Sequence, residues 1–186
     1  MTGTRAEGGG EREIPGTGRG ARASLQSMAM GERHQLADTP SSFEDAYRAH
    51  RLALVRLAYL LTSDRFVAEE LVQDAFAASE RVWATVQDPR SYLRSAVVNR
   101  CRSWLRRARL ERSRQPERAA SVELHADEMW DALGRLSPRR RAAIVLRFYE
   151  DLPDDEIARL LGCRPATVRT VVHRALADLR REMGRA

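Results

Sequence analysis

The sequence predicts an all-α fold made of two small helical domains joined by a flexible linker. Apolar residues recur at three- and four-residue spacing over most of residues 41–183, as they do on the buried face of a helix. No stretch alternates apolar and polar residues as a strand does. A polar segment at residues 110–122, which contains Pro116, interrupts the helical pattern and is the predicted linker.

The first 40 residues are predicted to be a disordered N-terminal tail. They contain a glycine run at residues 8–10 and have no apolar period, so they cannot bury enough surface to offset the entropy of an ordered chain. Met28 and Met30 stand just before the helical pattern begins, and one hypothesis is that the natural chain starts there.

Three helices are expected in the first domain, residues 41–109. The first begins at Ser42, with Asp45 completing a capping pattern, and is broken at residues 62–64. The second runs over about residues 64–83. The third spans about residues 89–109, because proline is well suited to the first position of a helix.

The third helix is strongly basic. Residues 89–118 hold ten arginines and two glutamates, whereas residues 41–80 hold four arginines and seven acids. The whole chain carries +6, and all 32 of its cationic residues are arginine. Such a balance points to a polyanionic partner, with nucleic acid the first choice.

The second domain, residues 123–183, is predicted to hold helices at 124–136, 138–149, 154–161 and 165–183. Ser137 is expected to cap the second of these, and Gly162 suits the left-handed end of the third. The last two helices, with the short turn between them, form a helix-turn-helix pattern. Its outward face carries hydroxyls and cations able to reach bases and phosphates, although an ordinary helical hairpin with a solvated arginine face is the alternative interpretation.

Two blocks of this sequence resemble the extracytoplasmic-function (ECF) sigma factors of bacterial RNA polymerase. EIARLLGCRPATVRTVVHRALADLR is similar to sigma region 4, a helix-turn-helix domain. FEDAYRAHRLALVRLAYLLTSDRFVAEELVQDAFAASERVW and DPRSYLRSAVVNRCRSWLRR are similar to the helical bundle of sigma region 2. The resemblance covers about residues 41–183 and lacks a region 3 domain between the two blocks.

The resemblance implies a polymerase-binding surface in the segment AEELVQDAF. In the family this segment docks on the clamp helices of the β′ subunit, and the β flap is a further expected contact. The implied contact residues are Glu70, Leu71, Gln73, Asp74 and Phe76. Core packing is the alternative role for Leu71 and for Phe76 taken alone.

The resemblance also implies two DNA-binding surfaces. Residues that would recognise and help to melt the minus-ten element are Tyr92, Arg94, Asn99, Arg100, Arg102, Arg106 and Arg107. Residues that would read the minus-thirty-five element are Arg164, Thr167, Arg169, Thr170, His173 and Arg174. Arg164 replaces a common Ser or Thr cap and Val171 a common arginine, so the promoter sequence does not transfer from relatives. Trp104 is expected to be core.

The expected function is therefore promoter recognition together with core RNA polymerase, under possible control by an anti-sigma factor. No catalytic constellation, metal-ligand cluster or cofactor motif is present in the sequence. The alternative is a stand-alone helix-turn-helix regulator of duplex DNA, which leaves the AEELVQDAF block and the basic helix unexplained. The sequence has no apolar run long enough to span a membrane, and its two cysteines lie far apart and form no CxxC motif. A cytoplasmic location with no membrane insertion is therefore expected.

Overall fold

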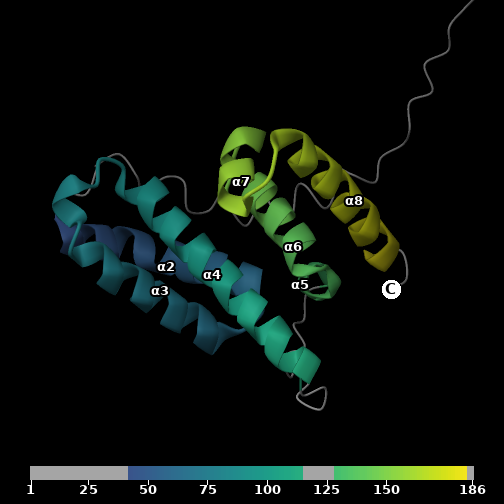
Figure 1. Ribbon diagram of the computed structural model, residues 1–186, viewed down its shortest axis with the longest axis horizontal. Coiled ribbons are helices and arrows are strands. Elements are labelled where there is room, and N and C mark those ends of the chain that lie inside the picture. The colour runs from purple at the N-terminus through teal and green to yellow at the C-terminus, as the bar shows by residue number, and fades with distance from the viewer. Residues whose placement is uncertain (1–41, 115–127, 184–186) are drawn as a thin grey trace, which may run out of the picture.

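The computed structural model describes residues 42–114 and 128–183, and every regular element in these ranges is helical. The helices form two groups (Figure 1): α2, α3 and α4 lie together, and α5 to α8 lie together beside them. The all-α, two-domain prediction is confirmed. The predicted tail lies outside the described residues.

The first group begins with two antiparallel helices closed by side-chain caps. The Ser42 hydroxyl accepts a hydrogen bond from the Asp45 N–H at 3.1 Å, and α2 runs over Phe43–Thr62. Ser63 then takes a left-handed conformation, with φ 58°, and ends the helix. The Asp64 carboxylate caps α3, Arg65–Glu80, by accepting from Val67 N–H at 3.0 Å.

The third helix of this group, α4, runs from Pro89 to Arg114 after a short 3₁₀ turn at Trp83–Thr85. The Asp88 carboxylate accepts from the Ser91 N–H at 3.1 Å, so Pro89 occupies the first turn of the helix as predicted. α3 ends at Glu80 rather than at Trp83, because Trp83 turns inward to pack its ring edge-on against Phe43.

A shared apolar core holds these three helices together. Leu57 and Leu61 of α2, Val72 of α3, and Leu93 and Val97 of α4 are almost completely buried. Each such side chain contributes about 1.5–3 kcal/mol on burial. Trp104, predicted to be core, lies half-buried against this cluster.

The second group contains α5 (Glu128–Arg135), α6 (Pro138–Ile144), α7 (Asp154–Leu161) and α8 (Pro165–Met183). A π-helical turn, η3 (Val145–Tyr149), continues α6. Ser137 stands at the cap position of α6, but its side chain makes no capping hydrogen bond.

One predicted boundary is wrong. Helix α4 continues through Arg114, five residues into the predicted linker. The described part of α5 begins at Glu128, and the predicted helix start at residue 124 lies outside the described residues. Leucine, glutamate and arginine are good helix formers, so residues 110–114 extend the helix without needing an apolar face. The remaining linker residues, 115–122, lie outside the described part of the chain.

The two groups also pack against each other, which the sequence did not predict. Helix α2 contacts α6 and η3, and α4 contacts α7. Leu61, Ala142 and Leu161 come together where the groups meet. The positions of the functional side chains therefore depend on this contact as well as on each domain's own fold.

Candidate nucleic-acid interface

The turn between α7 and α8 has the backbone geometry of a helix-turn-helix. Gly162 adopts φ 62° and ψ 47°, a left-handed conformation, as predicted. The Cys163 N–H donates to the Ala158 carbonyl at 3.0 Å and closes the end of α7. Ile157 and Leu161 of α7 and Val168 of α8 are buried, which fixes how the two helices cross.

This crossing leaves one face of α8 open to solvent. Arg169, Thr170, His173 and Arg174 are all exposed, with Arg164 exposed just before the helix and Thr167 half-buried. The Arg169 side chain is 71% exposed, and its Nε lies 3.7 Å from an Asp154 carboxylate oxygen. The Thr170 hydroxyl donates to the Ala166 carbonyl at 3.2 Å. All six predicted residues thus gather at the N-terminal half of α8.

Helix α4 carries a second line of polar side chains. Tyr92, Asn99 and Arg106 are seven residues apart, which places them along one side of the helix. All three are exposed, and Arg107 is exposed beside them. Arg100 is half-buried, with its guanidinium 3.4 Å from the Ala96 carbonyl, to which it donates.

Two of the predicted α4 residues, Arg94 and Arg102, make contacts with the second domain. Arg94 is 8% exposed, and its guanidinium is paired with Glu156 at 3.2 Å and Glu150 at 3.7 Å. Arg102 donates to the Leu161 carbonyl at 3.0 Å and to the Leu160 carbonyl. Both side chains therefore contact the second domain, although Arg102 remains exposed, and their role at the minus-ten element stays a prediction.

Helix α3 presents an acidic face to solvent. Glu70, Gln73 and Asp74 are exposed, as a protein-contact surface requires. Leu71 and Phe76, in contrast, are only 5% and 3% exposed, and the Phe76 ring packs edge-on against Tyr47. The structure corrects these two: they are core residues, because the helical period turns them to the inner side of α3.

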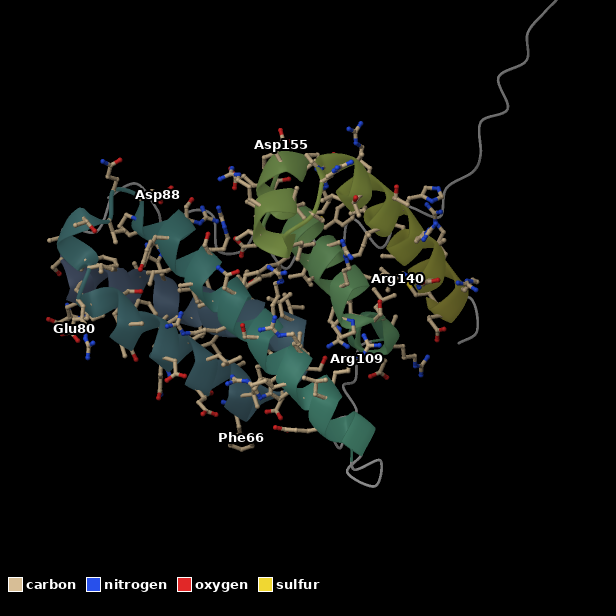
Figure 2. All side chains as sticks on the ribbon, in the orientation of Figure 1. Phe66, Glu80, Asp88, Arg109, Arg140 and Asp155 are labelled. Carbon is tan, nitrogen blue, oxygen red and sulfur yellow. The ribbon has the colours of Figure 1, made fainter. Side chains whose placement is uncertain are left out.

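Two exposed apolar residues beside this face were missed. Phe66 is 82% exposed and Leu52 is 57% exposed. Figure 2 shows Phe66 projecting outward from the start of α3. Phe66 stands four residues before Glu70, hence on the same face. That spacing was visible in the sequence, but only the structure separates an exposed phenylalanine from a core one.

Two hollows lie next to these surfaces. One, of about 460 Å³, is lined by α2 and α3 residues that include Leu52, Val55 and Glu69. The other, of about 630 Å³, lies between α4 and α6 and is rich in arginine. Its cationic lining residues are Arg102, Arg106, Arg109 and Arg139. It therefore favours anions over cations.

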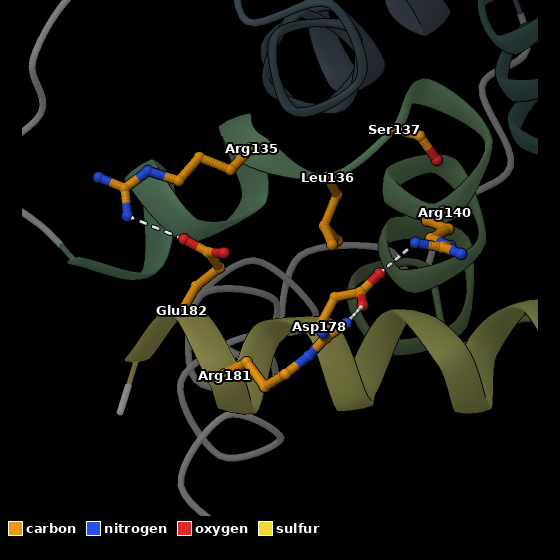
Figure 3. A pocket seen from close by; sticks show the side chains of 7 residues that line it. All are labelled: Arg135, Leu136, Ser137, Arg140, Asp178, Arg181 and Glu182. Carbon is orange, nitrogen blue, oxygen red and sulfur yellow. Dashed lines mark hydrogen bonds and ion pairs between the residues drawn. The ribbon is translucent and has the colours of Figure 1, made fainter. Parts of the chain in front are cut away.

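A third hollow, of about 150 Å³, is bounded by paired charges at the end of α8 (Figure 3). Arg135 lies 3.1 Å from Glu182, and Asp178 bridges Arg140 and Arg181. These pairs tie α8 to α5 and α6. Because every charge drawn there has an internal partner, this hollow is part of the scaffold that orients α8.

Few groups in the described residues have perturbed acidity. Burial, with Arg90 nearby, lowers the pKa of His50. Burial raises the pKa of the Cys101 thiol to about 12, so it stays protonated, and Cys101 and Cys163 are both free. Within the described ranges no cluster of three His, Cys, Asp or Glu side chains is placed to hold a metal ion. No described helix is long and apolar enough to span a membrane.

Comparison with known proteins agrees with this geometry. Residues 46–111 match the family model for sigma-70 region 2, and residues 126–179 match that for sigma-70 region 4. The chain is 36% identical to the RNA polymerase sigma-E factor of Streptomyces coelicolor over 151 residues, 76% of this chain and 85% of that protein. It is 32% identical to the ECF RNA polymerase sigma factor SigM of Mycobacterium tuberculosis over 91% of each chain.

Solved structures show the same fold. The sigma factor RpoE of Bartonella quintana, solved with the anti-sigma factor NepR, matches with a TM-score of 0.66 at 23% identity, over 76% of this chain and 96% of that one. CnrH, solved with the cytosolic domain of CnrY, matches with a TM-score of 0.55 at 25% identity, over 88% and 97%.

A basic helix and a helix-turn-helix on separate domains thus define a promoter-recognition subunit of the sigma-70 kind. The chain belongs to the ECF RNA polymerase sigma factors of that family. It directs core RNA polymerase to promoter DNA for transcription initiation, and the stand-alone regulator is not favoured. Sigma factors are initiation factors rather than enzymes.

Proposed function

We propose that the two domains divide promoter recognition between α8 and α4. The exposed N-terminal half of α8 reads the minus-thirty-five element in the major groove, through Arg169, Thr170, His173 and Arg174. Arg164 and Thr167 contact neighbouring phosphates. The observation that supports this assignment is that these polar side chains gather on one solvent-facing side of the second helix of a helix-turn-helix.

Helix α4 takes the opened minus-ten strand. Tyr92 offers a ring for stacking and Asn99 an amide for a base edge, while Arg106 and Arg107 hold the backbone. All four are exposed. Capturing an unstacked base offsets the few kcal/mol that unpairing costs, so this helix stabilises the open complex without catalysing a reaction itself.

The α3 face binds the core polymerase, with the β′ clamp helices as its partner. Glu70, Gln73 and Asp74 provide charge and hydrogen bonds. Phe66 and Leu52 provide the apolar anchors that the buried Leu71 and Phe76 cannot supply. Acidic groups around an exposed aromatic residue suit a basic helical partner, since the apolar contact gives affinity and the charges give orientation.

Site-specific photo-crosslinking tests these assignments in the complete initiation complex. A photoreactive residue replacing Thr170 should crosslink to duplex DNA near minus thirty-five, and one replacing Asn99 to the single strand near minus ten. One replacing Ala77, which is exposed seven residues after Glu70 on α3, should crosslink to polymerase and not to DNA. A transcribing complex that gave no DNA crosslink from position 170 or 99 would contradict the proposal.

We further infer that the protein acts in the cytoplasm beside the polymerase, under control by an anti-sigma protein. The support for such control is that RpoE of Bartonella quintana was solved with an anti-sigma factor. Proteins that co-purify with the native chain can be tested for loss of polymerase-dependent initiation when they are added back.

A further inference from the structure

We infer that Asp154, the first residue of α7, is a positioning residue that aims the Arg169 side chain at a base of the minus-thirty-five element. The carboxylate is held in turn by Arg147, so side chains from η3, α7 and α8 form one chain of contacts. This inference rests on the role proposed above for α8, and it names what orients one residue of that surface.

The Asp154 carboxylate lies between two guanidinium groups. Its Oδ2 lies 3.7 Å from the Arg169 Nε, an ion-pair distance, and its Oδ1 accepts a hydrogen bond from the Arg147 side chain. The Asp154 side chain is 24% exposed, whereas the Arg169 side chain is 71% exposed. A half-buried acid therefore contacts an arginine that is otherwise largely open to solvent.

Arg147 can hold this carboxylate because it lies in the π-helical turn η3. In that turn the Glu150 N–H donates to the Val145 carbonyl at 3.1 Å, five residues back, a geometry that is frequent at functional sites. The Arg147 guanidinium donates to the Leu152 carbonyl at 3.3 Å as well as to Asp154. The carboxylate is therefore fixed by contacts within the second domain before DNA binds.

A carboxylate at Nε leaves the other donors of an arginine available. The guanidinium group is planar and has five N–H donors, and its terminal nitrogens can bind N7 and O6 of guanine together. Orienting the plane in advance reduces the rotamer freedom that Arg169 loses on binding. The negative charge of Asp154 also disfavours a nearby phosphate. The contact therefore favours reading of a G·C base pair by Arg169 over binding of the DNA backbone.

An acid in the first turn of a helix also stabilises that helix through its dipole. Asp155 and Glu156 share this location, so the dipole does not distinguish Asp154 from them. Asp155 is exposed (Figure 2), and Glu156 pairs with Arg94 of α4 at 3.2 Å. The ion pair with α8 distinguishes Asp154 from both neighbours.

Asp154→Asn and Asp155→Asn are matched variants for a test in the complex of the full chain with core polymerase. Both remove one negative charge from the first turn of α7, so they change the helix dipole interaction and the general attraction to DNA alike. Arg169→Ala identifies the base pair that Arg169 reads. The DNA is a promoter fragment recovered by run-off transcription, with each base pair of its minus-thirty-five element replaced in turn.

The measurement is the ratio of initiation from the original promoter to initiation from each substituted promoter, at subsaturating protein. Because this ratio compares two DNAs with one protein preparation, a loss of folded protein cancels from it. We expect Asp154→Asn to lower the ratio about threefold or more at the base pair identified with Arg169→Ala, and to leave it unchanged at the other base pairs. Asp155→Asn should keep the wild-type ratio at every position.

A double variant shows whether the effect of Asp154 passes through Arg169. Adding Asp154→Asn to Arg169→Ala should lower the ratio at that base pair no further, because the side chain that the carboxylate positions is absent. Identical ratios for Asp154→Asn and Asp155→Asn, or a further loss in the double variant, would overturn the positioning role.

The single variants also separate this result from a failure of the proposed function. If Arg169→Ala lowered the ratio at one base pair and Asp154→Asn did not, Arg169 would still read the element and only the positioning role would fail. If Arg169→Ala lowered no ratio, the proposed base reading by Arg169 would fail, and the positioning role with it.

Discussion

The arginines of this sigma factor have different roles, which depend on the surroundings of each side chain. Arg174 is exposed on α8, Arg140 is paired with Asp178, and Arg141 is buried among carbonyls. Composition alone treats them as one basic population. Their roles diverge because each backbone position fixes which acids and carbonyls the guanidinium can reach.

Arg174 is the most direct test of the α8 surface. Arg174→Ala should lower initiation at a promoter that depends on its minus-thirty-five element by about tenfold or more, since a good arginine contact to a base is worth about 1–3 kcal/mol. The measurement is run-off transcription at subsaturating protein. Arg180→Ala is the control: Arg180 is exposed on the same helix but lies beyond the N-terminal part that enters a groove, and its loss should change little.

Phe66 tests the polymerase surface. Because its side chain is 82% exposed, Phe66→Ser should leave the free energy of unfolding nearly unchanged yet weaken binding to core polymerase by about tenfold, the effect of losing an interface anchor. Leu110→Ser removes another exposed apolar residue, on α4, and should leave polymerase affinity unaltered. Equal losses in the two variants would contradict the assignment of Phe66.

His50 makes stability depend on pH. Its pKa in the folded protein lies below the ordinary 6.5 because of burial, with Arg90 adding to the effect. The unfolded state therefore binds the proton better, and the free energy of unfolding should fall as pH drops below about 6.5. Asp88, whose pKa is lowered from 3.8 by hydrogen bonds from Ser91, contributes only at lower pH.

Urea unfolding at pH 7.5 and 5.5 checks this prediction. Wild type should lose stability between these values, and His50→Gln should lose less, because glutamine does not titrate. An identical loss in both proteins would show that other groups carry the pH dependence.

At the scale of single elements, Gly162 is the position where backbone conformation matters most. Gly162→Ala forces a side chain into φ 62°, at a cost of about 1–2 kcal/mol. We expect a corresponding decrease in the free energy of unfolding by urea, together with weaker promoter binding, because the turn sets the angle of α8. Gly134→Ala is the control, since an added Cβ there meets nothing within 4 Å; it should not destabilise the protein.

Element types were predictable from the sequence, and several element ends were not. Local chemistry marks the start of α2 at Ser42, the start of α4 at Pro89 and the end of α7 at Gly162, and all three were confirmed. The end of α4 was predicted too early because residues 110–114 are mostly polar, yet helix propensity sustains them. Leu71 and Phe76 were assigned to the polymerase-binding surface because the sequence of a contact motif does not distinguish an apolar residue that faces a partner from one that faces the core.

At the scale of the whole molecule, the contact between the two domains could not be predicted from the sequence. Arg94 and Glu156 are far apart in the chain, and nothing in either segment marks the other as its partner. The solvent-facing sets on α8 and α3 could be predicted because helical period alone determines them. The engagement of Arg94 and Arg102 depends instead on how two folded domains meet.

The central claim is that this chain places core RNA polymerase on promoters. The most direct test is run-off transcription by purified core polymerase, with and without the protein, on a library of upstream fragments from its own genome. Specific initiation that appears only when the protein is present is the predicted result. Binding of duplex DNA by the protein alone, with no initiation at any fragment, would contradict the claim and favour a stand-alone regulator.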